Sequence, residues 1–379
     1  MATVFTNHWL LRKIFYRIED LFTNPSNPSF NAQRPTMEIP TGAYNVSVEM
    51  ALNSRCTSDY DGNQYKFHWG LFDDSKTISD DQIKEIVDLA TVPHFTNERV
   101  QIRNAQNILS FVIDGEKQGL IREHMMIESG MQQQAVGLVC SALGVGMAFN
   151  SFSKDGRTIS NADYENIEIK LNPMKPSHGT SYWTDIPPDE DKSLRRDNLS
   201  NPLRNGNKNL LSALRELRGE NPNGQIATQE SIGQLLWAAR GRTPHLYKSK
   251  PWGMTIPTWG GEQNITSVYL IFGGILSRYV NWRWNGWAHS IESLREVGEE
   301  LQAELYNLLP PHNCLIVLGR NEHFARSYWE VGYQALNLML QAKSLNLSYR
   351  LLLVNEKQKD ILLKIGIKDP AAALFTTHA

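Results

Sequence analysis

The chain has 379 residues, of which 41% are hydrophobic, and this length favours two domains that each have a core. Its 38 basic and 40 acidic residues leave a formal net charge of −2, which gives no reason to expect nucleic acid or an anionic membrane surface as a partner. The three cysteines, Cys56, Cys140 and Cys314, lie far apart and match neither a metal-binding nor a redox spacing, as expected in a reducing cytoplasm.

Residues 1–41 predict a short amphipathic helix followed by a proline-rich arm. Charged residues such as Arg12, Lys13 and Asp20 interrupt the first apolar segment, so it lacks the apolar core of a signal peptide. No stretch approaches the roughly 20 uninterrupted apolar residues that a membrane span needs. We therefore expect a soluble, cytoplasmic protein.

Residues 42–172 predict a first module. Within it, Ser79–Ala90 has a capping residue at its start and apolar residues at helical spacing, which indicates an amphipathic helix. We also expect a short helix over Val46–Ser54, a buried strand over Ile108–Ile113, and a long apolar helix within Glu123–Met147 that ends at Gly144-Val145-Gly146.

Residues 173–207 hold five prolines and a run of charges, a composition typical of a linker. Residues 208–379 then predict a second module in which the order of elements repeats. We expect helices over Leu210–Leu217, Thr228–Ala239 and Tyr328–Leu347, and strands over Val268–Phe272 and Leu315–Leu318.

An internal repeat supports this division. At a constant offset of 202 residues the first module matches the second at Glu128 and Glu330, Gly130 and Gly332, Gln132 and Gln334, and Leu143 and Leu345. The capped helices align as well, at an offset of 149 residues. Any two amphipathic helices look alike, but two pairs in the same order favour a duplicated chain. We expect an intrachain pseudo-dimer whose halves pack about an approximate twofold axis.

The segment Gln234–Ile271, QLLWAARGRTPHLYKSKPWGMTIPTWGGEQNITSVYLI, resembles the azoline-dehydrogenase (SagB-like) branch of the nitroreductase superfamily. In that branch a helix ending in an LLWAA-like sequence precedes a Pro-Ser-x-Gly-like loop and a strand. The family's Glu-x-Gly helix is matched by Glu128-Ser-Gly130 and Glu330-Val-Gly332. The resemblance covers most of both modules, but neither the N-terminal arm nor the linker. It implies an α+β, nitroreductase-like fold that binds FMN where two modules meet.

The resemblance implies two composite half-sites for FMN. In the first module, Arg55 and Ser58 match the phosphate element, in which an arginine fork and hydroxyls bind phosphate, although the family's second arginine is absent. The second module offers Arg218 instead, beside acidic residues that repel phosphate. The ring-side loop is better kept in the second module, as Pro257-Thr258-Trp259-Gly260-Gly261, than at Pro93–Asn97 of the first.

Further residues complete the expected site. Gly144 and Gly146 allow close backbone approach at the end of the first long helix, whereas Asn346 and Ser348 replace them in the second module. Glu128 and Glu330 either neighbour the flavin or serve as helix caps and ion pairs. The phosphate element and helix of the first module, combined with the loop of the second, predict a single FMN per chain.

Tyr328 is the candidate catalytic residue, because the azoline dehydrogenases carry a Lys-Tyr pair before the long helix. No lysine precedes it here, and Arg326 cannot act as a general base at neutral pH. The aromatic stretch around Trp282 and His289 either walls a substrate pocket or, as we prefer, packs in the core. No metal spacing is present among the histidines.

These observations predict a flavin-dependent oxidoreductase. We expect hydride transfer between FMN and a small-molecule or peptide substrate, with NAD(P)H left open as the electron partner. The rival interpretation is a binding or regulatory protein that kept the fold and lost the flavin, since a fold alone does not establish activity.

Overall fold

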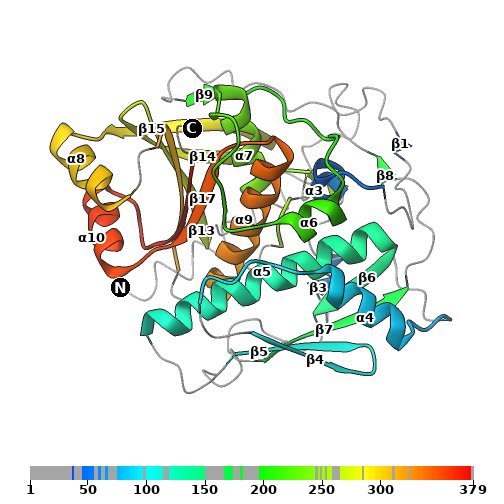
Figure 1. The fold of residues 1–379 in the computed structure, drawn as a ribbon. Coiled ribbons are helices and arrows are strands. Elements are labelled where there is room, and N and C mark those ends of the chain that lie inside the picture. Colours follow the sequence, from blue (N-terminus) through cyan, green and yellow to red (C-terminus); the bar gives the residue numbers. More distant parts are fainter. Residues whose placement is uncertain are drawn as a thin grey trace, which may run out of the picture.

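The computed structural model describes residues 36–37, 45–54, 59–60, 65–66, 75–96, 100–113, 119–149, 166–173, 180–181, 196–243, 246–247, 250–251, 254–257, 265–283, 286–309, 312–322 and 325–376. Helices pack against antiparallel sheets, so the α+β class expected from the sequence is confirmed. Figure 1 shows the six-stranded sheet below helix α5 and the eight-stranded sheet beside helix α9. None of the described helices is both long and apolar enough to cross a membrane.

The first module contains the six-stranded sheet, in the order β2-β3-β6-β7-β5-β4. Its helices are α3 (Val48–Ser54), α4 (Asp80–Leu89) and α5 (Gly119–Leu143). Its strands are β2 (Asp59–Tyr60), β3 (Tyr65–Lys66), β4 (Gln101–Ala105), β5 (Ile108–Val112), β6 (Val145–Phe149) and β7 (Asn166–Pro173). Helix α4 begins as the sequence predicts, because the side chains of Ser79 and Gln82 form a capping box. Residues 145–147, expected at the end of the long helix, instead begin strand β6.

The second module contains the eight-stranded sheet, in the order β10-β17-β18-β16-β13-β14-β15-β9. Its helices are α6 (Leu210–Glu216), α7 (Gln229–Arg240), α8 (Glu299–Leu308), α9 (Ala325–Ser344) and α10 (Glu356–Ile365). Its strands are β9 (Arg196–Asn198), β10 (Glu220–Asn221), β13 (Thr266–Phe272), β14 (Ile275–Arg283), β15 (Gly286–Glu296), β16 (Cys314–Arg320), β17 (Tyr349–Leu353) and β18 (Pro370–Thr376). Two short pairs join β1 (Thr36–Met37) to β8 (Thr180–Ser181) and β11 (Leu246–Tyr247) to β12 (Lys250–Pro251).

The two sheets share one strand order over five positions. The series β3-β6-β7-β5-β4 corresponds to β10-β17-β18-β16-β13, and α5 and α9 precede β6 and β17 in the same way. A tight turn at Gln106-Asn107 joins β4 to β5, whereas β14, β15 and α8 intervene between β13 and β16. This insertion contributes to the increase of the repeat offset from 149 to 202 residues.

Helices α5 and α9 contact each other at the glycines of the repeat. A Cβ atom on Gly130 would lie 2.8 Å from the Cα atom of Trp329, and one on Gly332 would lie 2.8 Å from the Cα atom of Gly130. The carbonyl oxygens of Trp329 and Ile127 would be closer still. Because Ile127 and Trp329 are themselves 202 residues apart, each helix presents the same residues to the other, as an isologous contact does.

The core lies on both faces of the eight-stranded sheet. The larger hydrophobic cluster surrounds α5, α7 and α9 and runs through both modules without a break. A second cluster fills the opposite face beneath α8 and α10, with Leu305, Ile361 and Phe375 among its members. Strands β16 and β18 are buried along their whole length because helices cover them on both faces.

Candidate functional site

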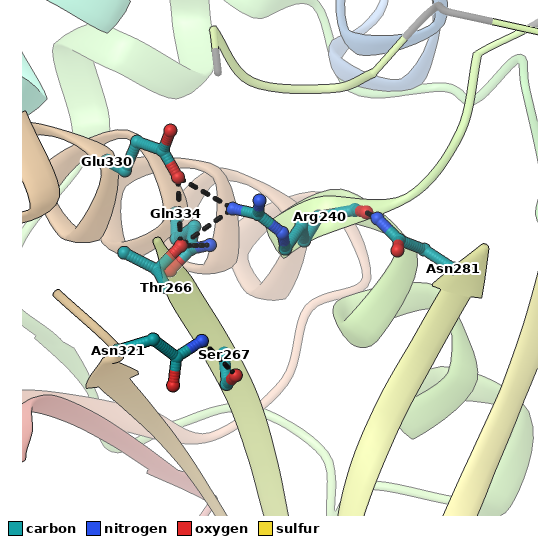
Figure 2. A network of polar contacts seen from close by, with 7 residues as sticks. All are labelled: Arg240, Thr266, Ser267, Asn281, Asn321, Glu330 and Gln334. Atoms are coloured by element: carbon teal, nitrogen blue, oxygen red, sulfur yellow. Dashed lines mark hydrogen bonds and ion pairs between the residues drawn. The ribbon is translucent and has the colours of Figure 1, made fainter. Parts of the chain in front are cut away.

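A buried ion pair joins three elements of the second module (Figure 2). Arg240, at the end of α7, donates from Nη1 to Glu330 Oε2 of α9 at 2.8 Å and to Thr266 Oγ1 of β13 at 2.6 Å. The Thr266 hydroxyl donates to the same carboxylate oxygen at 3.0 Å and accepts from Gln334 Nε2 at 2.9 Å. Both charged side chains are almost fully buried, so each balances the desolvated charge of the other.

Glu128 makes an analogous connection in the first module. Its Oε1 accepts the backbone N–H groups of Phe95 and, at 2.7 Å, of Thr96, and its Oε2 accepts the Thr96 hydroxyl at 3.1 Å. Burial raises the pKa of Glu128, and these three hydrogen bonds oppose that rise. Both glutamates of the Glu-x-Gly repeat therefore anchor the chain that follows the capped helix. A role beside a flavin stays a prediction for both.

The chain that leads into the expected ring-side loop is held by both modules. The carbonyl oxygen of Thr255 accepts hydrogen bonds from Gln134 Nε2 of α5 at 3.2 Å and from Asn337 Nδ2 of α9 at 3.1 Å. The amides of Gln134 and Asn337 are also bonded to each other, at 2.9 Å. Pro257 follows two residues later. Thr258, Trp259, Gly260, Gly261, Arg55 and Ser58 lie outside the described residues.

Arg242 is a buried cation next to this loop. Its backbone forms a bridge with Met254, its Nε donates to the carbonyl oxygen of Asn281 at 3.2 Å, and its guanidinium lies 4.8 Å from the ring centroid of Trp282. Burial, reinforced by the nearby Arg240, lowers its pKa to about 9. Among the described residues, no carboxylate contributes to the pKa of Arg242. Sequence reasoning missed it, because an arginine after a helix carries no local signal of its burial.

His289 and Tyr279 form a second buried pair in this region. The Tyr279 hydroxyl and His289 Nδ1 are 2.8 Å apart, and the two rings meet edge to face. Burial lowers the pKa of His289 to about 4 and raises that of Tyr279, so both groups are neutral near pH 7. The burial of His289 agrees with the packing interpretation of the aromatic stretch.

The opposite half-site is closed by an aromatic ring. Phe95 lies against Gly219 so closely that a Cβ atom on this glycine would be 2.9 Å from the ring. The neighbouring Arg218 is exposed and turns back onto its own segment, donating to the carbonyl oxygens of Leu217 at 2.8 Å and Arg215 at 3.3 Å. The structure thus brings Phe95, in the segment expected as the first module's loop, against Gly219, in the segment expected as the second module's phosphate element.

The two long helices end in the same conformation. Gly144 has φ +71° and Asn346 has φ +52°, so both adopt the left-handed conformation that ends a helix. Asparagine tolerates this conformation better than other non-glycine residues, so Asn346 can end the second helix as Gly144 ends the first. Gly146 lies within β6, opposite Asn172 of β7.

Tyr328 lies at the start of α9 beneath an arginine. The guanidinium carbon of Arg320 is 3.6 Å from its ring centroid, a cation–π contact, and the side chain is buried. Burial raises the pKa of Tyr328, and a hydrogen bond to Glu123 adds to that rise, so the phenol is neutral near pH 7 and does not act as an anionic base. No cluster of three metal-binding side chains occurs in the described ranges.

Comparison with known proteins gives a fold likeness at low identity. No protein-family model matches the sequence, and no curated protein matches it. One similar solved structure is a candidate nitroreductase from Ralstonia eutropha JMP134, with 19% identity, a TM-score of 0.39 and coverage of 53% of this chain and 98% of that one. Another is a candidate nitroreductase from Anabaena variabilis ATCC 29413, with 12% identity, a TM-score of 0.47 and coverage of 68% of this chain and 65% of that one. Likeness at these values assigns neither a family nor an activity to this chain.

Proposed function

We propose that this chain is an FMN-dependent oxidoreductase of the nitroreductase-like kind, related to the SagB-like branch. In this proposal a tandem duplication produced two modules that form an intrachain pseudo-dimer. The shared strand order of the two sheets and the reciprocal contact at Gly130 and Gly332 support the duplication. The motifs around Gln234–Ile271 support the choice of family.

The cofactor site that we propose lies where the second module's loop meets the first module. Arg55 and Ser58 would hold the phosphate of FMN, and the segment from Pro257 to Gly261 would border its ring. The observation that carries this proposal is Thr255, whose carbonyl oxygen is held by Gln134 of one module and Asn337 of the other. That anchorage fixes a loop at a module junction, which is the position that a composite cofactor site requires.

The buried charge of Arg242 fits this cofactor. FMN, when bound, supplies hydride transfer, and its reduced ring is electron-rich. A desolvated guanidinium without a carboxylate partner in the described part of the chain, next to the loop that would border the ring, offers the complementary charge. Tyr328 stays the candidate catalytic residue, acting on a small-molecule or peptide substrate. NAD(P)H is the electron partner that we propose.

One FMN per chain follows from the asymmetry of the two half-sites. Phe95 fills the space beside Gly219, and Arg218 is turned away from it. The same observation favours the second candidate function, a binding or regulatory protein without flavin, because a fold can be kept without its activity.

An absorbance spectrum distinguishes these functions. The purified full chain is incubated with excess FMN and desalted, and bands near ~370 and ~450 nm are measured against protein concentration. A ratio of one FMN per chain supports the composite site, whereas a ratio of two contradicts the single site. Absence of retained FMN would contradict the oxidoreductase proposal and favour the flavin-free function.

A matched pair of variants locates the cofactor. Arg242→Met should weaken FMN retention by roughly tenfold, because it removes a charge-assisted contact in a desolvated place. Arg278→Met serves as the control, because Arg278 is half exposed and already paired with Glu292 at 2.8 Å. Equal retention by both variants would contradict the role proposed for Arg242.

A further inference from the structure

A polar cleft opens where strands β13 and β14 separate. The two strands pair only between Tyr269–Phe272 and Ile275–Arg278, and toward Thr266 and Trp282 they diverge. Figure 2 shows the strands apart at this end, with Arg240 and Asn281 between them. The cleft between them has a volume of about 450 Å³, which suits a small organic ligand.

The lining of this cleft carries excess positive charge. Arg196, Arg240, Arg278 and Lys368 contribute four cations, and among the described lining residues Glu292 is the one carboxylate. Glu330 balances Arg240 from behind the lining. When that pair and the pair of Arg278 with Glu292 are set aside, Lys368 still contributes a positive charge to the lining.

The charge at Lys368 is not cancelled by its neighbour in sequence. Asp369 forms ion pairs with Arg320 and, at 3.0 Å, with Lys359, so its carboxylate is already balanced. The Lys368 ammonium group is exposed and donates to the carbonyl oxygen of Asn321 at 2.9 Å. A neutral carbonyl oxygen does not cancel the positive charge of Lys368. The ammonium group has three hydrogens, so two others can be donated to an anion.

The cleft also offers a flat surface and polar anchors. Trp282 contributes an aromatic ring to the lining, whereas Tyr269, also among the lining residues, is largely buried in the second hydrophobic cluster. The Asn321 side-chain amide donates to the Ser267 hydroxyl at 2.8 Å, which fixes two polar side chains of the lining. Aromatic walls with a few fixed polar groups are typical of sites for small aromatic ligands.

We propose that this cleft binds a small aromatic carboxylate. The ring of the ligand packs on Trp282, and its carboxylate points toward Lys368 and Asn321. The described lining of the site lies on the second module alone, and Trp282 joins it to Arg242. Occupation of the cleft requires neither flavin nor oxidoreductase activity.

Ligand-observed NMR titration tests this site, with 2-naphthoate as the probe and 2-naphthamide as its uncharged counterpart. A ligand of this size is expected to bind with a Kd on the order of 0.1–1 mM. The amide should bind about tenfold more weakly, because it lacks the charge. An increase of the NaCl concentration from roughly 50 to 300 mM should weaken the binding of 2-naphthoate but not that of 2-naphthamide, because salt screens the attraction between the carboxylate and the cations of the cleft.

Two lysines that are close in sequence, Lys368 and Lys364, provide a variant and its matched control. Lys368→Gln should weaken 2-naphthoate binding by about threefold to tenfold, since it removes one partly exposed charge from the site. Lys364→Gln removes an exposed charge four residues away that pairs with Glu304 outside the cleft, and it should leave the Kd unchanged. Circular dichroism verifies that both variants keep the fold.

Several results would overturn the proposal. The first is that 2-naphthoate does not bind, and the second is that 2-naphthamide binds as tightly as 2-naphthoate. The third is that Lys368→Gln and Lys364→Gln change the Kd of 2-naphthoate equally. Displacement of 2-naphthoate by excess FMN would also overturn it, because the cleft would then belong to the flavin site. Flavin retention measured on the same preparations reports separately on the proposed oxidoreductase function.

Discussion

The close contact of α5 with α9 allows a quantitative test of helix packing in the core. In Gly332→Ala the new Cβ atom would lie 2.8 Å from the Cα atom of Gly130 and from the backbone nitrogen of Met131, and closer to the carbonyl oxygen of Ile127. Ordinary van der Waals contacts begin at 3.4 Å, and each obstructing atom belongs to backbone. The helices must therefore move apart along a buried contact, rather than a side chain turning aside.

The magnitude follows from two opposing terms. Overpacking of a tight core costs about 1–3 kcal/mol and sometimes more, and the backbone obstruction places this site at or above the upper end. Alanine returns about 1 kcal/mol through its better helix propensity. We expect a net loss of about 2–4 kcal/mol in the free energy of unfolding, measured by urea denaturation.

Gly233→Ala is the matched control, because Gly233 also lies in a buried helix. Its Cβ atom would lie 3.6 Å from the Leu199 side chain, an ordinary contact. This variant should be as stable as the wild type or more stable. If Gly332→Ala changed the free energy of unfolding by less than about 1 kcal/mol, the close approach of the two helices would not be a requirement of the fold.

Three further outcomes can be measured by the same denaturation assay. Glu330→Gln should lower the free energy of unfolding by about 3–5 kcal/mol, because it leaves Arg240 buried without its carboxylate; a loss below about 1 kcal/mol would show that the pair is solvated. Asn346→Val should cost about 1–2 kcal/mol, whereas Asn346→Gly should be neutral or stabilising, since φ is +52° at this position; equal effects would contradict the left-handed helix end. Burial lowers the pKa of His289 to about 4, below its unfolded value of 6.5. The folded state therefore has its full stability above pH 6.5 and loses stability as the pH falls from 6.5 toward 4, because only the unfolded chain binds a proton at this residue in that range. Between pH 7 and pH 5 the wild type should lose about 2 kcal/mol that His289→Gln retains, and parallel pH profiles would contradict this assignment.

The sequence by itself determined the locally encoded parts of this protein. The starts of α4 and α7 could be predicted because their capping residues, Ser79 and Thr228, bond to backbone three residues away. The two Glu-x-Gly helices could be recognised as a repeat for the same reason, since their pattern is contained in one helix each. The strands β5, β13 and β16 could be predicted from short apolar runs. Strand β16 is buried along its whole length, β13 over most of its length, and β5 at alternate residues.

Only the tertiary structure decided how these elements combine. Several elements surround Arg242 and desolvate it. The contact of Phe95 with Gly219 and the hydrogen bond from Gln134 to Thr255 each join residues that are distant in sequence. Such contacts leave no local pattern, because burial and hydrogen-bond partners depend on the folded arrangement and not on neighbouring residues. The separation of β13 from β14 is likewise a property of strand pairing, and so the cleft between them could not be read from the sequence.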